Sequence, residues 1–159
     1  MVRTQNPFWI GLGLITVFFH IWLIFSGLVP SLISRPIHMA LAIPWVFLFV
    51  SKNKGQLYLE SIIAVIGVFC CFYIALNEQS LSDQYGFIQG GYQFIIGSLL
   101  IAITLEMARR TVGWPLPVIT LLFLLYGLIG DKVPGEFGHA GIPLNSFLGT
   151  LVITEGGLW

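Results

Sequence analysis

Residues 57–76 read LYLESIIAVIGVFCCFYIAL, and this stretch decides the fold class of the chain. It carries one charged side chain, Glu60, near its beginning, and almost all of the rest is apolar. An α-helix of about 20 such residues crosses the hydrocarbon core of a bilayer. Because the backbone inside lipid must satisfy its own hydrogen bonds, the stretch predicts a membrane-spanning helix.

Further apolar runs lie on both sides of this stretch. A proline inside the second run, Pro44, predicts a kink there, because proline removes one backbone hydrogen bond. Trp114-Pro115 opens the last run, which suits the first turn of a helix. The five predicted spans cover residues 8–29, 37–50, 57–76, 87–107 and 114–129.

The segment 142–159 has a different pattern. Leu144, Phe147, Leu148, Leu151 and Val152 recur at the spacing of one helix face, with polar residues elsewhere. This pattern predicts an amphipathic helix that lies along the membrane interface or against a partner, ended by Glu155-Gly156-Gly157.

The composition agrees with a membrane protein. Of the 159 residues, 57% are hydrophobic and 9% are charged, and the mean hydropathy is +0.91. Soluble domains carry roughly 25% charged residues, so a water-facing surface is excluded. The net charge of zero removes the electrostatic case for binding nucleic acid. The sequence therefore predicts an all-α polytopic membrane protein, with five spans and a C-terminal amphipathic helix. The adjacent Cys70 and Cys71 are predicted to be apolar helix residues.

The basic residues of the short loops predict the orientation. Cytoplasmic loops carry an excess of lysine and arginine. One side of the predicted topology has more of them than the other, and this places the N-terminus in the cytoplasm. The richer side holds Arg3, Lys52, Lys54, Arg109 and Arg110, and the opposite side holds Arg35 and Lys132.

Two carboxylates fall at the edges of predicted spans. An ionisable side chain within a span is a functional candidate. Glu60 has a second interpretation, as a headgroup-level carboxylate paired with a lysine. Glu106 precedes Arg109 and Arg110 by three and four residues, so it predicts an ion-paired helix end rather than a proton relay. No carboxylate lies mid-bilayer, which argues against a coupling-ion site built from these residues alone.

Two histidines within the spans raise the possibility of haem ligation. His20 and His38 are placed at depths that differ by roughly 10 Å, so they are not expected to meet at one iron. His20 is instead predicted to form an interhelical hydrogen bond. Gly86 and Gly90, at the beginning of the fourth predicted span, could allow close helix contact. No catalytic or metal-binding motif is present, so the chain is predicted not to be an enzyme and to carry no cofactor.

Residues 105–114, LEMARRTVGW, resemble the LE-x-x-RR-x-x-G signature of the fused permeases of tripartite ATP-independent periplasmic (TRAP) transporters. The resemblance is to the branch that uses TAXI-type binding proteins. It continues in order through a Tyr-x-x-x-Gly element, a Val-Pro-Gly turn, a His-x-Gly element and a Thr-Glu-Gly-Gly-Leu-Trp junction. These elements are Tyr126–Gly130, Val133-Pro134-Gly135, His139-Ala140-Gly141 and Thr154–Trp159, which include Glu155 and Gly156.

The resemblance implies a division of the chain and a set of partners. Residues 1–112 would be the four-span small-subunit-like region, and residues 113–159 a connecting segment that leads toward a transport domain. The sodium and substrate sites would lie in that large domain, on a separate chain or in a longer one. The implied partners are the large permease domain, a TAXI-type periplasmic binding protein and membrane lipids.

The function implied is a scaffold-like component that helps to import an organic, carboxylate-like solute with a sodium gradient across a bacterial or archaeal inner membrane. Glu106, Arg109, Arg110, Gly113 and Trp114 are the candidate lipid or partner contacts. An alternative is a membrane anchor subunit of a redox complex that binds haem or quinone. A stand-alone channel is disfavoured by the lack of mid-bilayer charge. The candidate junction and turn residues are Pro134, Gly135, His139, Gly141, Glu155 and Gly156.

Overall fold

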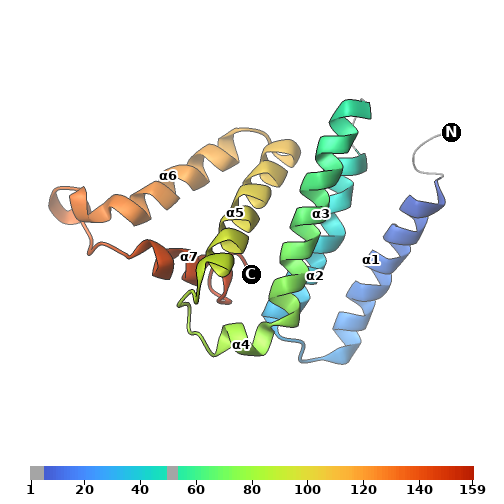
Figure 1. The fold of residues 1–159 in the computed structure, drawn as a ribbon, viewed down its shortest axis with the longest axis horizontal. Coiled ribbons are helices and arrows are strands. Elements are labelled where there is room, and N and C mark those ends of the chain that lie inside the picture. Colours follow the sequence, from blue (N-terminus) through green and yellow to red (C-terminus); the bar gives the residue numbers. More distant parts are fainter. Residues whose placement is uncertain (1–5, 50–53) are drawn as a thin grey trace. The chain divides into compact units, whose positions relative to one another are not determined.

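The chain is an all-α polytopic membrane protein, as predicted. A computed structural model describes residues 6–49 and 54–159, and these contain no strand (Figure 1). Five of its helices are long and apolar enough to cross a bilayer. Arg3 and Lys52, which the predicted orientation uses, lie outside the described residues.

The helices are α1 (Pro7–Ser26), α2 (Ser31–Pro44), the π-helix η2 (Trp45–Phe49), α3 (Lys54–Leu76), α4 (Glu78–Ser82), α5 (Gly91–Thr111), α6 (Pro115–Ile129), the 3-10 turns η3 (Gly130–Lys132) and η4 (Gly135–Phe137), and α7 (Leu144–Val152).

The helices form two compact units, residues 1–78 and 79–159. The first contains α1, α2, η2 and α3, and the second contains α5, α6 and α7. This boundary reflects packing within each unit. The division into residues 1–112 and 113–159 concerns a functional boundary and stays a prediction.

In the first unit, α2 begins at Ser31 and not at Ile37, so its predicted beginning was wrong. Arg35 and Pro36 interrupt the apolar run, but Pro36 lies near the beginning of the helix and is buried there. Pro36 lies past the first turn, so it removes the hydrogen bond that would run to the Leu32 carbonyl, a loss that neighbouring groups can compensate in a membrane helix. The added residues lengthen α2 with η2 to a span of Ser31–Phe49.

A change of helix type marks the position of Pro44. The chain leaves α2 at this residue and continues as the π-helix η2, which is a local disturbance of the kind that the proline predicts. The Trp45 and Phe49 rings of η2 contact the Trp9 ring of α1, with centroids 5.0 and 5.1 Å apart. This aromatic cluster joins the beginning of α1 to the end of the second span.

The core of the first unit lies between α2 and α3, which run side by side in Figure 1. Cys70 and Cys71 are free and buried, which confirms that they serve as apolar helix residues. The α1 helix buries only Trp9, so most of its apolar surface is available to lipid. The buried residues of the α2–α3 core include Ile43, Phe47, Ala64 and Ile74.

In the second unit, α5 begins at Gly91, four residues after the predicted beginning at Phe87. Gly86 and Gly90 have φ angles of 85° and 86°, in the left-handed region that favours glycine. The pair therefore lies in a loop, and the prediction that it enters the helix was wrong. Gly86 still allows a close contact, because a Cβ there would lie 3.3 Å from the Thr150 hydroxyl oxygen on α7.

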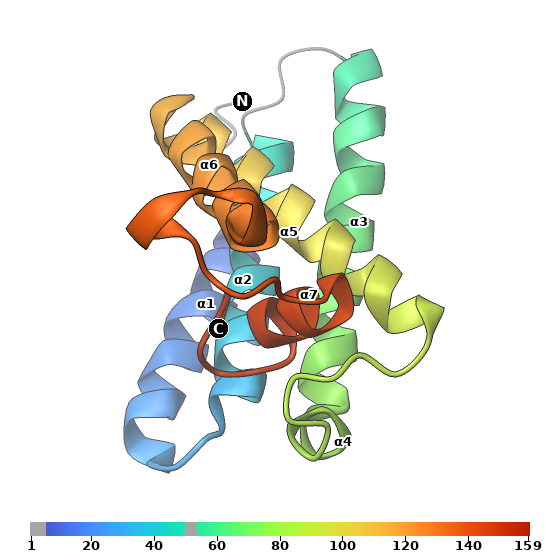
Figure 2. The ribbon, with the colours of Figure 1, turned by 90° about the vertical axis from the view of Figure 1, so that its left-hand side faces the viewer.

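The α7 helix is a short element that packs on α5 (Figure 1, Figure 2). Its nine residues span about 14 Å, roughly half of the hydrocarbon core, so α7 cannot cross a bilayer. Leu148 and Val152 are buried, and Gly97 of α5 gives them room, since a Cβ there would lie 3.3 Å from Leu148 Cγ. The predicted amphipathic helix is thus present but shorter than predicted.

The chain beyond α7 turns back on the helix. The Leu158 N–H donates to the Leu151 carbonyl at 2.7 Å, and the Trp159 indole N–H donates to the Val152 carbonyl. Trp159 is 4% exposed. The helix therefore ends at Val152, and the prediction that it continues to Glu155 was wrong.

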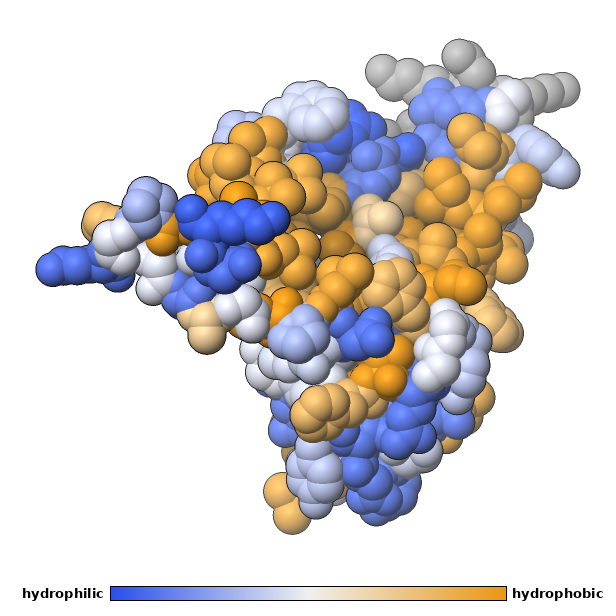
Figure 3. Space-filling model, turned by 60° about the vertical axis from the view of Figure 1, so that its left-hand side comes forward, coloured by the Kyte–Doolittle hydropathy of each residue, from blue (hydrophilic) through white to orange (hydrophobic). Residues whose placement is uncertain are grey.

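The surface matches a chain solvated by lipid. Figure 3 shows hydrophobic side chains over much of the face in view, with hydrophilic side chains mostly toward its edges. On α6, Leu122 and Phe123 are 61% and 71% exposed. Such exposure of large apolar side chains is costly in water and favourable against acyl chains.

Candidate functional site

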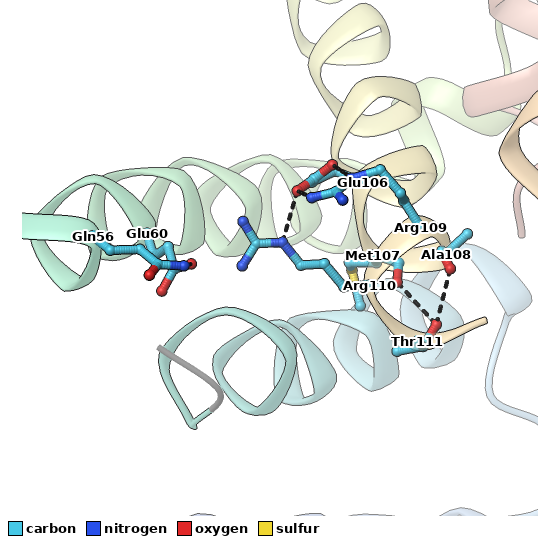
Figure 4. Close-up of polar contacts among 8 residues, drawn as sticks. All are labelled: Gln56, Glu60, Glu106, Met107, Ala108, Arg109, Arg110 and Thr111. Carbon is cyan, nitrogen blue, oxygen red and sulfur yellow. Dashed lines mark hydrogen bonds and ion pairs between the residues drawn. The ribbon is translucent and has the colours of Figure 1, made fainter. Parts of the chain in front are cut away.

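The end of α5 holds a cluster of one carboxylate and two guanidinium groups. Arg109 grips Glu106 with two hydrogen bonds, from Nε and from one terminal nitrogen, each 2.7 Å long. Arg110 Nε donates to the same carboxylate at 2.7 Å (Figure 4). These distances are those of charge-assisted bonds, which hold Glu106 as a carboxylate. The predicted ion-paired helix end is therefore confirmed.

The two arginines were predicted to lie after the end of the fourth span and to stop it. They instead form part of the last turn of α5. Cations suit this position, because the last carbonyl groups of a helix carry partial negative charge. The helix ends at Thr111, and the chain turns away at Gly113, whose φ angle is 98° and whose N–H donates to the Arg109 carbonyl at 3.1 Å. A left-handed glycine is a common way to end a helix.

The elbow between α5 and α6 brings Trp114 to the arginines. Pro115 opens α6 directly after it. The Arg109 guanidinium carbon lies 5.2 Å from the centroid of the Trp114 ring, within the range of a cation–π contact. Gly113 makes this possible, because the sharp reversal places the residue after it over the last turn of α5.

The cluster is suited to binding an anion at the membrane surface. Two guanidinium groups face one carboxylate, so its net charge is positive. The side chains of Arg109 and Arg110 are 35% and 20% exposed. Arginine recognises phosphate and carboxylate groups, and tryptophan is enriched at the membrane–water interface. The arrangement fits a phospholipid headgroup or an acidic group of a partner protein.

The second candidate carboxylate is Glu60, near the beginning of α3. Its side chain is buried, with an exposure of 2%, and its position at headgroup level stays a prediction. The Gln56 side chain donates to it at 2.8 Å from one helical turn away (Figure 4). The predicted lysine partners, Lys52 and the side chain of Lys54, lie outside the described residues.

His20 and His38 meet, although they were predicted to lie at different depths. Their ring nitrogens, Nε2 of His20 and Nδ1 of His38, are 2.6 Å apart. The depth prediction was wrong because it used the wrong beginning for α2. With α1 ending at Ser26 and α2 beginning at Ser31, the two histidines lie six and seven residues from the turn. The predicted interhelical hydrogen bond of His20 is present.

Haem ligation is not favoured by this contact. The centroids of the two imidazole rings are 4.8 Å apart, and a hydrogen bond joins them directly. An iron between two axial histidines needs each nitrogen at about 2 Å, with a flat macrocycle between the rings. In this arrangement the rings leave no space for it.

The turn after α6 is held by side-chain contacts. The Tyr126 hydroxyl donates to the Phe137 carbonyl at 2.6 Å, and the His139 ring packs edge-on against the Tyr126 ring with centroids 5.2 Å apart. The His139 N–H donates to the Gly130 carbonyl at 3.1 Å. A Cβ at Gly130 would overlap the His139 ring, so a larger residue there would require the ring to move.

The remaining predicted turn residues lie around this structure. Pro134 is extended and precedes η4, Gly135 has a φ angle of 81°, and Gly141 packs against the Asp131 side chain. Glu155 and Gly156 are exposed in the turn after α7, outside the helix.

The cavities of the second unit are apolar. A crevice of about 200 Å³ lies between α5, α6 and the residues after α7, where Thr104, Leu105 and Leu124 line it. No group of three or more metal-ligating side chains occurs among the described residues. The crevice suits a hydrocarbon chain better than a polar solute.

No family model, no curated protein and no solved structure matches this chain. The family resemblance rests on residues 105–159 alone.

Proposed function

We propose that the chain is the scaffold-like membrane component of a TRAP-type transporter. The Glu106–Arg109–Arg110 cluster and its elbow at Gly113-Trp114 carry this proposal. Each position of the signature has a physical role in the fold: the carboxylate orients both arginines, the glycine reverses the chain, and the next residue covers Arg109.

The crevices and the ion-paired carboxylate favour a structural role for this chain over a transport site within it. The described residues offer apolar crevices and a carboxylate held by arginines, and neither selects a polar solute or a sodium ion. In the proposed complex, a large permease domain supplies those sites. A periplasmic binding protein delivers the solute, an organic carboxylate, in a bacterial or archaeal inner membrane.

The proposal predicts that this chain transports nothing by itself. Purified residues 1–159 in liposomes with an inward sodium gradient should show no solute uptake above empty liposomes. Uptake should appear when the large permease domain and the binding protein are added. The measurement is accumulation of a panel of radiolabelled organic acids.

The control for this test is the permease domain reconstituted without the chain. If uptake by that domain and its binding protein is the same with and without residues 1–159, the chain has no scaffold role. Sodium-driven uptake by the chain alone would also contradict the proposal.

The proposed orientation predicts which cysteines an impermeant thiol reagent reaches from outside the cell. Gly55→Cys and Thr111→Cys should stay unlabelled, and Ser82→Cys and Glu136→Cys should react. All four positions are exposed, and native Cys70 and Cys71 are buried. Glu136 is preferred to Gly138, where a Cβ would lie 2.5 Å from the Val133 carbonyl oxygen.

Permeabilised cells provide the matched control, since all four cysteines should then be labelled. Labelling of Gly55→Cys and Ser82→Cys from the same side of intact cells would contradict the span assignment. Labelling of only Gly55→Cys and Thr111→Cys would reverse the orientation and leave the spans unchanged.

A further inference from the structure

The His20–His38 contact fixes the direction of a hydrogen-bond chain inside the membrane. Nδ1 of His20 lies 2.6 Å from the Thr16 carbonyl oxygen, which can only accept, so this nitrogen carries the proton. Nε2 of neutral His20 is then an acceptor, and Nδ1 of His38 must donate to it. The same logic leaves Nε2 of neutral His38 with a lone pair.

That lone pair lies on an exposed residue within a candidate span. His38 is exposed, and it lies seven residues, about 10 Å, from the beginning of α2. A polar group facing hydrocarbon without a partner is costly, and ionisable side chains in spans usually face another polar group. The exposed His38 is therefore available to a hydrogen-bond donor from outside the first unit.

Arg35 adds a positive charge one turn away. It precedes His38 by three residues on α2, and side chains at this spacing lie on the same face of a helix. Arg35 is exposed and forms no ion pair within the part of the chain that the structure describes. The same ligand could therefore meet the guanidinium cation of Arg35 and the lone pair on Nε2 of His38.

We propose that Arg35 and His38 form a binding site for a single carboxyl group on the exposed side of the α1–α2 hairpin. A carboxylic acid can donate its proton to Nε2 of His38 while its other oxygen accepts from Arg35. The proton moves between the carboxyl oxygen and Nε2 without any change in total charge. The Arg35 cation stabilises the carboxyl oxygen that it contacts through a charge-assisted hydrogen bond.

His20 is the positioning residue of this site. Its bond to Thr16 holds the His20 ring, and Thr16 in turn donates from its hydroxyl to the Leu12 carbonyl at 2.8 Å. When His38 holds the added proton, its Nδ1–H still donates to His20, now as a charge-assisted bond. Protonation therefore preserves the contact between the helices.

Few other ionisable groups lie on the helices around the site. The described part of α1 has no titratable side chain besides His20, and α2 has only Arg35 and His38. Glu60 lies near the beginning of α3, at the opposite end of α2 from the Gly27–Pro30 turn. The other titratable residues of α3 are Lys54, at its first position, Tyr58, Cys70, Cys71 and Tyr73.

The carboxyl group could belong to a lipid-soluble acid or to an acidic side chain of a partner helix, and one experiment separates the two. The chain in lipid nanodiscs is titrated with carboxyl-labelled oleic acid, and binding is followed by the NMR signals of the carboxyl carbon and of the histidine nitrogens. In parallel, co-purification with the large permease domain of the proposed complex is quantified. Only the second arm depends on the proposed function.

A site for a free acid predicts that oleic acid shifts the His38 signals and that methyl oleate does not. Arg35→Gln and His38→Gln should each weaken the binding of oleic acid at least tenfold. The affinity of Arg35→Lys for oleic acid should remain within threefold of that of the parent chain. If the carboxyl group belongs to a partner side chain, Arg35→Gln and His38→Gln should each reduce co-purification with the large permease domain, and Arg35→Lys should reduce it least.

Arg35→Gln leaves the histidine pair intact, so its effect cannot be attributed to loss of the hairpin. If Arg35→Gln and His38→Gln match the parent in both arms, the proposal is overturned. Equal binding of methyl oleate and oleic acid overturns the free-acid form, because an ester cannot supply the proton. Failure of co-purification by the parent chain, with oleic acid binding intact, counts against the proposed function alone.

Discussion

Replacing Gly149 by alanine should detach α7 from the loop before α5 and destabilise the second unit by about 1–3 kcal/mol. The added Cβ would overlap the carbonyl oxygen of Gly86, which is a backbone atom that cannot rotate away. Alanine gains roughly 0.5–1 kcal/mol of helix propensity over glycine, so the overlap dominates. A nine-residue helix is not stable alone, and α7 should therefore unfold when it loses this contact.

The measurement is thermal unfolding in detergent together with limited proteolysis within α7, whose backbone is helical while it packs on α5. Gly91→Ala is the matched control, because no atom of the unit lies within 4 Å of the Cβ that it adds. That variant should unfold at the parent temperature or slightly above. Equal behaviour of the two variants would show that α7 does not pack against Gly86.

The double change Arg109→Ala/Arg110→Ala should weaken association with the large permease domain or with bound phospholipid by at least 100-fold, about 3 kcal/mol. The exposed ion pairs contribute only about 0–1 kcal/mol by themselves, so stability of the isolated chain should change little. In the proposed complex the cations would be buried against an acidic group or a phosphate. Their loss would leave that anion and Glu106 without compensating charge.

Three variants separate the possible roles of this cluster. Arg109→Lys/Arg110→Lys keeps the charge but loses the bidentate hydrogen bonding to Glu106. Its affinity for the permease domain or phospholipid should lie between those of the double alanine variant and the parent. Trp114→Ala removes the ring over Arg109 and should have a smaller effect than the double change. Complex recovery and phosphate content after purification are the readouts. Parent values for the double alanine variant would leave the arginines as a topology signal only.

The spans could be predicted from sequence because bilayer thickness imposes one length on them. The fifth predicted run and α6 end at the same residue, Ile129, where a glycine follows. Errors arose where a local residue conflicted with the hydropathy. Pro36 made α2 look shorter than it is, and apolar Phe87 extended the fourth predicted span into a loop whose backbone Gly86 and Gly90 determine.

The histidine pair shows how a small boundary error becomes a wrong conclusion about a site. Moving the beginning of α2 by six residues shifts every depth along it by about 9 Å, which nearly equals the predicted separation of His20 and His38. The Glu106–arginine cluster was easier to predict because helix spacing alone brings its members together. The short α4 helix and the fold-back of Trp159 carried no periodic signal, because both are shorter than a pattern needs.

The contact between Gly130 and His139 restricts how this chain can evolve. A side chain at position 130 would overlap the imidazole, so it requires the imidazole to move or to be replaced first. Replacing His139 by a smaller residue meets no such obstacle at Gly130. This coupling therefore constrains the order of substitutions, with position 139 changing before position 130. A homologue with histidine at the second position and a larger residue at the first would disprove this coupling.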